Sequence, residues 1–218
     1  PVADYIPFGE FPHLGRYAMT LDPALQSQAE KLVKSQVLAL TAQKVTGGAL
    51  VAIRPSTGEI LSMVGSPDFY GGKSGQINMA TSPRQPGSAI KPLTYVAAFE
   101  KGWTPATLIW DVSSEFPPSG DPTDTRAPYK PTNYDLKEHG PLSVRVALAN
   151  SFNIPAVKAL EYVGIYDNPN IAGPDGLIAF AKRLGINSFT RQDYGLALTL
   201  GGGEVSLLEL TSAYTAFA

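Results

Sequence analysis

The sequence has 218 residues, which is enough for one large domain or two small ones. It is 44% hydrophobic and 17% charged, and its formal net charge of −2 excludes a broad electrostatic attraction for nucleic acid, so no nucleic-acid partner is predicted. The absence of cysteine excludes disulfides and thiolate chemistry. The sequence also contains no run of about 18 apolar residues, the length needed to span a membrane. The two histidines, His13 and His139, stand far apart without ligand-like spacing, so we predict no metal site and interpret both as surface residues.

The two ends of the sequence suggest a piece of a longer protein. Residues 1–18 are rich in Pro and Gly and are interpreted as an extended lead-in or linker. The sequence begins without Met, and it stops inside an apolar helical pattern that has no C-cap.

A helix is predicted to begin after Asp22, which suits an N-cap, with Pro23 at the first helical position. It is predicted to end before Gly47 and to have an apolar face made of Leu25, Ala29, Leu32, Val33, Val37 and Leu40. The apolar runs 49–53 and 60–64 then flank a turn, which predicts a β-hairpin. Because both runs are continuously apolar, we expect helices to cover the hairpin on both sides.

After the hairpin, the sequence predicts helices separated by loops and turns. Residues 65–87 form a long Gly/Pro/Ser loop of the kind that is often functional, and the helix after it is closed by Lys101 and Gly102. Residues 103–140 contain many prolines and are predicted to be ordered but irregular. Further helices are predicted at 142–149, from Pro155 at a first helical position to about Gly164, at 175–185, and after the capping box 206–209.

Ser88 and Lys91 are spaced so that a helix would place them on one face, one turn apart. A lysine amine that burial keeps neutral can take the proton of a serine hydroxyl and make it a nucleophile. The N–H groups at a helix N-terminus can hold the oxyanion that forms. Taken alone, the pair fits an N-cap serine and a solvated lysine better, and this alternative stays open at this point.

Ser151-Phe152-Asn153 is the only Ser-x-Asn sequence in the chain and lies 63 residues after Ser88. It is predicted to form a turn between two helices, where side chains can point into a cleft. The alternative is that Asn153 caps the helix that begins at Pro155, and Asn153 could do both.

These motifs resemble the transpeptidase domain of class A (bifunctional) penicillin-binding proteins. Residues 84–92 are similar to the first motif of that family, and residues 151–153 to the second. Further stretches agree with the family in their order, namely residues 20–23, 58–61, 130–135, 147–151 and 204–217. The resemblance identifies residues 19–218 as the N-terminal portion of such a domain.

The resemblance implies an α/β fold of the α+β type, the penicillin-binding protein/serine β-lactamase-like fold, in which helices pack on an antiparallel sheet. Only the first hairpin of that sheet is expected in this chain, because the third family motif, Lys-Thr-Gly on a strand, is not found after Asn153. We expect this motif and about three strands beyond Ala218. The remaining C-terminal part of the domain, in the same polypeptide or as a separate chain, is therefore a predicted partner, and the hairpin is expected to expose apolar surface without it.

The function that the resemblance implies is that of a D,D-transpeptidase, which cross-links peptidoglycan stem peptides through a serine acyl-enzyme. Stem peptides ending in D-Ala-D-Ala and β-lactam antibiotics are the implied partners, without metal or organic cofactor, at the extracytoplasmic face of the bacterial cell membrane. The implied catalytic residues are the nucleophile Ser88, its base Lys91, the proton carrier Ser151 and the substrate-orienting Asn153. Predicted substrate-binding residues are Gly87, Asn133 and Tyr134.

Two other functions on the same fold stay open. A β-lactamase needs a base that activates water against the acyl-enzyme, and the Glu-x-x-Leu-Asn sequence that supplies it in class A β-lactamases does not occur here. A non-catalytic penicillin-binding sensor module would not need the complete set of two serines, lysine and asparagine.

Overall fold

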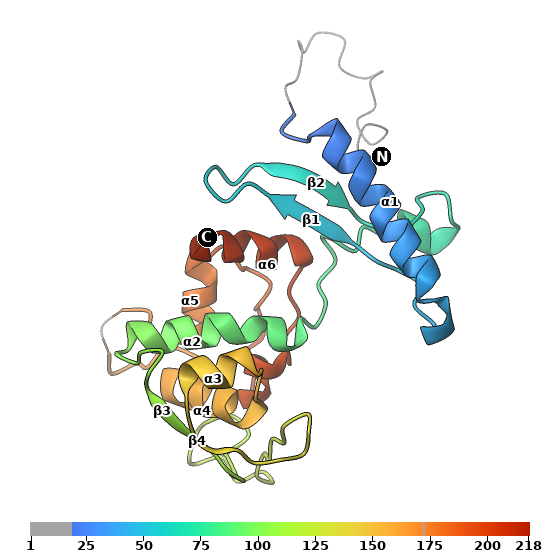
Figure 1. The fold of residues 1–218 in the computed structure, drawn as a ribbon. Helices are drawn as coiled ribbons and strands as arrows, with labels where there is room; N and C mark the ends of the chain where they lie inside the picture. The colour runs from blue at the N-terminus through green and yellow to red at the C-terminus, as the bar shows by residue number, and fades with distance from the viewer. Residues whose placement is uncertain (1–18, 172) are drawn as a thin grey trace. The chain divides into compact units, whose positions relative to one another are not determined.

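The structure is a computed structural model that describes residues 19–171 and 173–218 (Figure 1). The lead-in predicted at residues 1–18 lies outside the described residues. The described chain divides into two compact units, the first made of residues 19–82 and 206–218 and the second of residues 83–205. In the part of the chain that the structure describes, no helix is long and apolar enough to cross a membrane.

In the first unit, helix α1 (Pro23–Ala39) begins as predicted. The side chain of Asp22 accepts hydrogen bonds from the amides of Ala24 and Leu25, at 2.9 and 3.0 Å. The helix ends before Gly47, as predicted, and its last residue is Ala39. One position of the predicted apolar face was wrong, because Leu32 is 54% exposed. The residues that face the hairpin are Ala29 and Val33, and the neighbouring position Leu32 lies about 100° further round the helix.

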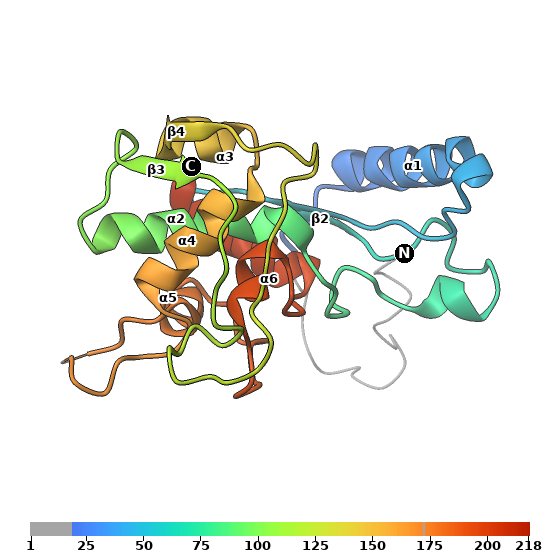
Figure 2. The ribbon, with the colours of Figure 1, turned by 90° about the horizontal axis from the view of Figure 1, so that it is seen from below.

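The predicted hairpin is confirmed as the antiparallel strands β1 (Leu50–Ile53) and β2 (Ile60–Val64). Helix α1 packs against β2, and α6 (Leu207–Tyr214) packs against β1. The two helices lie on opposite sides of the hairpin (Figures 1 and 2), as the continuously apolar strands predicted. The predicted capping box is present at the start of α6, between Ser206 and Glu209.

The second unit is built around helix α2 (Lys91–Glu100), which packs against three other helices. These are α3 (Val144–Ala149), α4 (Asn153–Val163) and α5 (Leu177–Arg183). Tyr95 on α2 and the small residues Ala156 and Ala159 on α4 belong to one core cluster, and all three are fully buried. Across both units, short 3₁₀ helices lie at Thr41–Gln43, Lys73–Gln76, Gly87–Ile90, Leu196–Leu200 and Thr215–Phe217.

A second antiparallel pair, β3 (Leu108–Asp111) and β4 (Gly140–Ser143), was not predicted. It occupies the two ends of a region that was expected to be irregular, and a separate bridge joins Phe116 to Tyr129 between them. Burial alternates along β3, but the sequence does not: the exposed residues Leu108 and Trp110 are apolar, and the buried Asp111 is charged. Because β4 takes residues 140–143, helix α3 begins at Val144 and not at residue 142.

Candidate active site

The segment that carries Ser88 is a single 3₁₀ turn, Gly87–Ile90, directly before α2. Gly87 has φ +59°, and nothing lies within 4 Å of the Cβ position that a side chain would occupy, so glycine serves the backbone conformation here. The N-cap of α2 is Ile90, without a side-chain hydrogen bond. The alternative that Ser88 is an N-cap serine is therefore wrong, and Ser88 is instead exposed at the entry to the helix.

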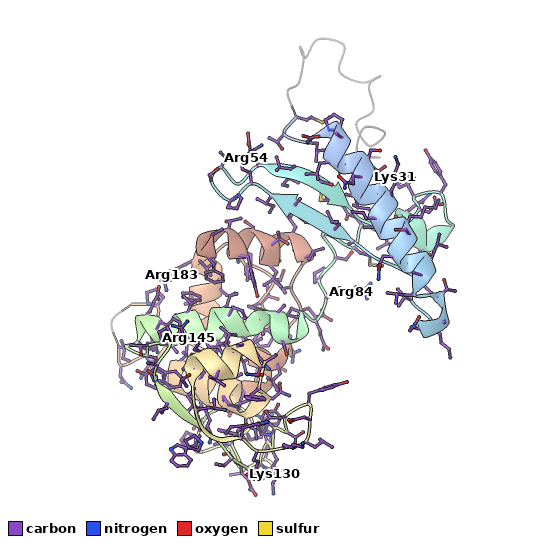
Figure 3. All side chains as sticks on the ribbon, viewed as in Figure 1. Lys31, Arg54, Arg84, Lys130, Arg145 and Arg183 are labelled. Atoms are coloured by element: carbon purple, nitrogen blue, oxygen red, sulfur yellow. The ribbon has the colours of Figure 1, made fainter. Side chains whose placement is uncertain are left out.

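The start of this segment and the residues before it make backbone contacts within the second unit. Arg84, which is labelled in Figure 3, exchanges two backbone hydrogen bonds with Val205, at 3.0 and 2.9 Å. Gly201 lies against the turn itself, because a Cβ atom at this position would be 2.4 Å from the amide nitrogen of Gly87. Gly201 was missed as a functional residue, although the run of three glycines at 201–203 was a signal in the sequence.

Lys91 is fully buried, so the alternative of a solvated lysine is wrong. Its Nζ atom donates to the carbonyl oxygen of Ser151 at 2.6 Å and to Oδ1 of Asn153 at 2.7 Å. Longer contacts join it to Oγ of Ser151 at 3.2 Å and to the carbonyl oxygen of Phe152 at 3.3 Å. The structure thus brings together three of the predicted catalytic residues, with Ser88 one helical turn before the lysine and not among its hydrogen-bond partners.

Burial lowers the pKa of Lys91 from 10.5 to about 8, because the charged form loses its hydration. None of the four acceptors around Nζ is a carboxylate. A neutral amine has two N–H groups, enough for the two short contacts to Ser151 and Asn153, and it keeps a lone pair for a hydroxyl proton. The site can therefore hold Lys91 in either protonation state.

Ser151 adopts φ +54°, a left-handed conformation that costs a residue with a side chain roughly 1–3 kcal/mol. It lies in the turn between α3 and α4, where its amide donates to the carbonyl oxygen of Leu148 at 3.0 Å. This conformation turns both its carbonyl oxygen and its hydroxyl toward Lys91. The strained backbone of this turn thus presents two oxygens to the amine of Lys91.

Helix α4 begins at Asn153, so the predicted start at Pro155 and the alternative that Asn153 is the N-cap were both wrong. The N-cap position is occupied by Phe152, without a side-chain hydrogen bond. The Asn153 side chain instead donates from Nδ2 to the carbonyl oxygen of Thr132 at 2.8 Å and accepts from Lys91 through Oδ1. The same side-chain amide thus links the lysine to the loop between β3 and β4.

The N-terminus of α4 is capped by Asn133. Oδ1 of Asn133 accepts from the amides of Asn153 at 2.8 Å and Ile154 at 3.4 Å. Its Nδ2 donates to the carboxylate of Asp111 and to the carbonyl oxygen of Lys137. Because Asn133 is 2% exposed and its polar atoms have partners inside the protein, we reinterpret this predicted substrate-binding residue as one that positions α4. The adjacent Tyr134 is 100% exposed.

His139 is exposed, as the sequence suggested, but its ring also makes specific contacts, and His13 lies outside the described residues. Nδ1 of His139 lies 2.6 Å from Oδ2 of the fully buried Asp111. Its ring also stacks on Phe152, with the centroids 3.9 Å apart. Neither contact was visible in the sequence, because no local motif connects residues this far apart. Among the described residues, no group of three or more His, Asp and Glu side chains is clustered so that it could hold a metal ion.

Comparison with known proteins gives this arrangement a family. The family model of the penicillin binding protein transpeptidase domain matches residues 48–218, and the chain belongs to this family. It is 40% identical over 172 residues to penicillin-binding protein 1A of Aquifex aeolicus, covering 78% of this chain and 21% of the relative. It is 32% identical to penicillin-binding protein 1C of Escherichia coli, covering 91% of this chain and 24% of the relative. The resemblance to class A penicillin-binding proteins is thereby confirmed.

Solved structures agree with the predicted α/β fold class. Penicillin-binding protein 1A from Haemophilus influenzae superposes with a TM-score of 0.65 at 30% identity, over 78% of this chain and 23% of that one. The PonA1 protein from Mycobacterium tuberculosis, in complex with penicillin V, gives a TM-score of 0.70 at 21% identity over 92% of this chain and 50% of that one. The chain spans about a quarter or less of the curated relatives described above.

We predict that Gly201→Ala destabilises the protein by about 2–4 kcal/mol, because the new Cβ atom would overlap the backbone of Gly87 and the residue would keep φ +96°. The measurement is the free energy of unfolding in denaturant. The matched control is Gly185→Ala, at φ +88° with nothing within 4 Å of its Cβ position, for which about 1 kcal/mol is expected. Equal losses in the two variants would show that the contact with Gly87 is unimportant.

Proposed function

We propose that the chain provides the serine nucleophile and its base in a D,D-transpeptidase that cross-links peptidoglycan stem peptides and that β-lactams acylate. The observation that carries this proposal is the buried Lys91 amine, held by Ser151 and Asn153 one helical turn from the exposed Ser88. The family of the chain supports acyl transfer in cell-wall synthesis. Because the chain spans only part of its relatives, the activity is proposed for the protein that carries it.

The acylation step begins with the neutral form of Lys91. Its lone pair takes the hydroxyl proton of Ser88, directly or through Oγ of Ser151, while Oγ of Ser88 bonds to the carbonyl carbon between the two D-alanines. The amide of Ser88 donates to the oxyanion that forms. Collapse of this intermediate breaks the C–N bond, and the proton reaches the leaving amine by way of Ser151.

The second step returns the enzyme to its starting state. The amine of a neighbouring stem peptide attacks the ester carbon and gives a proton to Lys91, and Oγ of Ser88 leaves and recovers its proton. Asn153 donates or accepts a hydrogen bond at the substrate amide and so fixes the reacting carbonyl. A β-lactam enters the same first step: Oγ of Ser88 bonds to the lactam carbonyl carbon and the ring C–N bond breaks. The amine formed stays covalently attached to the acyl group and cannot leave the site, so the adduct persists.

We expect Ser88→Ala to abolish covalent labelling by a fluorescent penicillin in the full protein, because the atom that forms the ester is removed. Labelling is read on a denaturing gel, and the melting temperature checks that the fold is intact. Ser113→Ala, at an exposed serine, is the matched control and should label normally. Label that survives in Ser88→Ala means that another residue is the nucleophile.

The lifetime of the label separates the three candidate functions. An adduct on Ser88 that persists for hours supports the transpeptidase, and turnover within seconds supports a β-lactamase. A folded wild-type protein that takes no label at all supports a non-catalytic module and overturns the proposal.

We expect the acylation rate to rise with pH and to level off above the pKa of Lys91, which burial lowers to about 8. At pH 7 about a tenth of such a lysine is neutral, against about one part in several thousand at the ordinary value. Stopped-flow acylation between pH 6 and 10 measures this profile. Lys91→Arg keeps the positive charge but cannot be deprotonated, so it should lose acylation at every pH. A rate that is flat with pH, or an active arginine variant, would exclude Lys91 as the base.

A further inference from the structure

A chain of hydrogen bonds runs from His139 through Asp111 and Asn133 to the N-terminus of α4. We infer that His139 is a positioning residue of the active site: by holding the Asp111 carboxylate, it fixes Asn133, the start of α4, and with them the oxygens that hold Lys91. This inference rests on the proposed function of the site. Asp111 is the last residue of β3, Asn133 lies in the loop before β4, and His139 ends that loop. Residues that are distant in sequence thus meet at one helix terminus.

Asp111 is the centre of this chain because it is a carboxylate with 0% exposure. Its two oxygens lie 3.0 and 2.8 Å from Nδ2 of Asn133. Oδ2 also accepts from the backbone amide of His139 at 3.1 Å and faces the ring nitrogen Nδ1 at 2.6 Å. A buried carboxylate is tolerated only with such partners. If the ring of His139 no longer donates, the Asp111 carboxylate keeps two donors, the side-chain amide of Asn133 and the backbone N–H of His139.

The geometry around His139 is that of a protonated ring. Nδ1 faces Asp111, and Nε2 faces Oδ2 of Asp135 at 3.1 Å, so both nitrogens meet acceptors and both act as donors. The hydrogen bond to Asp111 also raises the pKa of His139, more than burial lowers it. On α2, burial and, to a smaller extent, the charge of Asp111 raise the pKa of Tyr95. The ring face of His139 meets Phe152, which carries no charge.

The last link transmits this arrangement to the proposed catalytic residues. Oδ1 of Asn133 accepts a hydrogen bond from the backbone amide of Asn153, and Oδ1 of Asn153 accepts one from the amine of Lys91 at 2.7 Å. Phe152, on which the ring of His139 stacks, offers its carbonyl oxygen to the same amine. A shift of His139 therefore reaches Lys91 by two routes, and small displacements at a reacting centre have large effects on rate.

The experiment compares two variants of His139 in the full protein. His139→Asn keeps an N–H donor for Asp111 without the ring, whereas His139→Phe keeps a ring on Phe152 without the donor. We expect His139→Phe to lower the acylation rate constant about tenfold or more, with initial penicillin binding unchanged, and His139→Asn to stay within about threefold of the wild type. Glu138→Gln, an exposed neighbour, is the charge control and should match the wild type.

A merely structural ring would give the opposite order, with Phe tolerated and Asn impaired, and that order would overturn the inference. Two variants that are equally slow would overturn it as well. A double-mutant cycle adds Asn133→Ala: because the two residues act in one chain, the combined loss should be close to the larger single loss and well below the product of both. Independent, multiplying losses would contradict the chain.

The pH dependence of stability gives a readout that needs no substrate. Because the pKa of folded His139 is above its unfolded value of about 6.5, the stabilisation from its charge is complete below about pH 6.5 and is lost as pH rises through the folded pKa. The melting temperature of the wild type should therefore exceed that of His139→Asn at pH 5.5, and the difference should disappear at alkaline pH. A difference that does not change with pH would overturn the charged pair.

Failure of the inference and failure of the proposed function are distinguishable. A wild-type protein that penicillin does not label overturns the proposed function and the positioning role with it. A labelled wild type with an unimpaired His139→Phe variant overturns the positioning role alone and leaves the transpeptidase intact.

Discussion

The arrangement of the helices in the second unit depends on the burial of the Lys91 amine. Lys91 is fully buried, yet no carboxylate is among its hydrogen-bond partners. An ion in this position is costly unless oxygens replace its hydration, and here three consecutive residues, 151–153, supply all four of them. The α3–α4 turn must therefore lie directly over the start of α2. The small side chains of Ala156 and Ala159 belong to the core cluster that α2 and α4 share, which lets the two helices approach closely.

The requirement for these oxygens explains one conformation that breaks a local rule. Ser151 takes a left-handed conformation, which glycine or asparagine would adopt at lower cost. Serine suits position 151 because its hydroxyl adds a second contact to Lys91 beside the one that the backbone carbonyl makes. Conflict between local preference and observed backbone is expected where a site requires a geometry that the sequence would not choose by itself.

The sequence allowed those features to be predicted that depend on neighbours in the chain. Asp22 and Pro23 mark a helix start by their own chemistry, and the hairpin follows from two apolar runs around a turn. The pairing of Lys91 with residues 151–153 could be anticipated only through family resemblance, because the partners are about 60 residues apart in sequence. His139 and Asp111, which are 28 residues apart, carry no motif, so their contact could not be predicted.

The unpredicted strands β3 and β4 have a function that their short length conceals. Their ladder pairs Asp111 with Gly140, the residue directly after His139. This register brings the amide of His139 to the carbonyl oxygen of Asp111 at 3.1 Å, and the ring then reaches the carboxylate. A slip by one residue would turn the Asp111 side chain to the opposite face of the pair, away from Asn133. Four residues per strand are thus enough to decide which carboxylate is buried behind α4, and through it how firmly the turn holds the lysine.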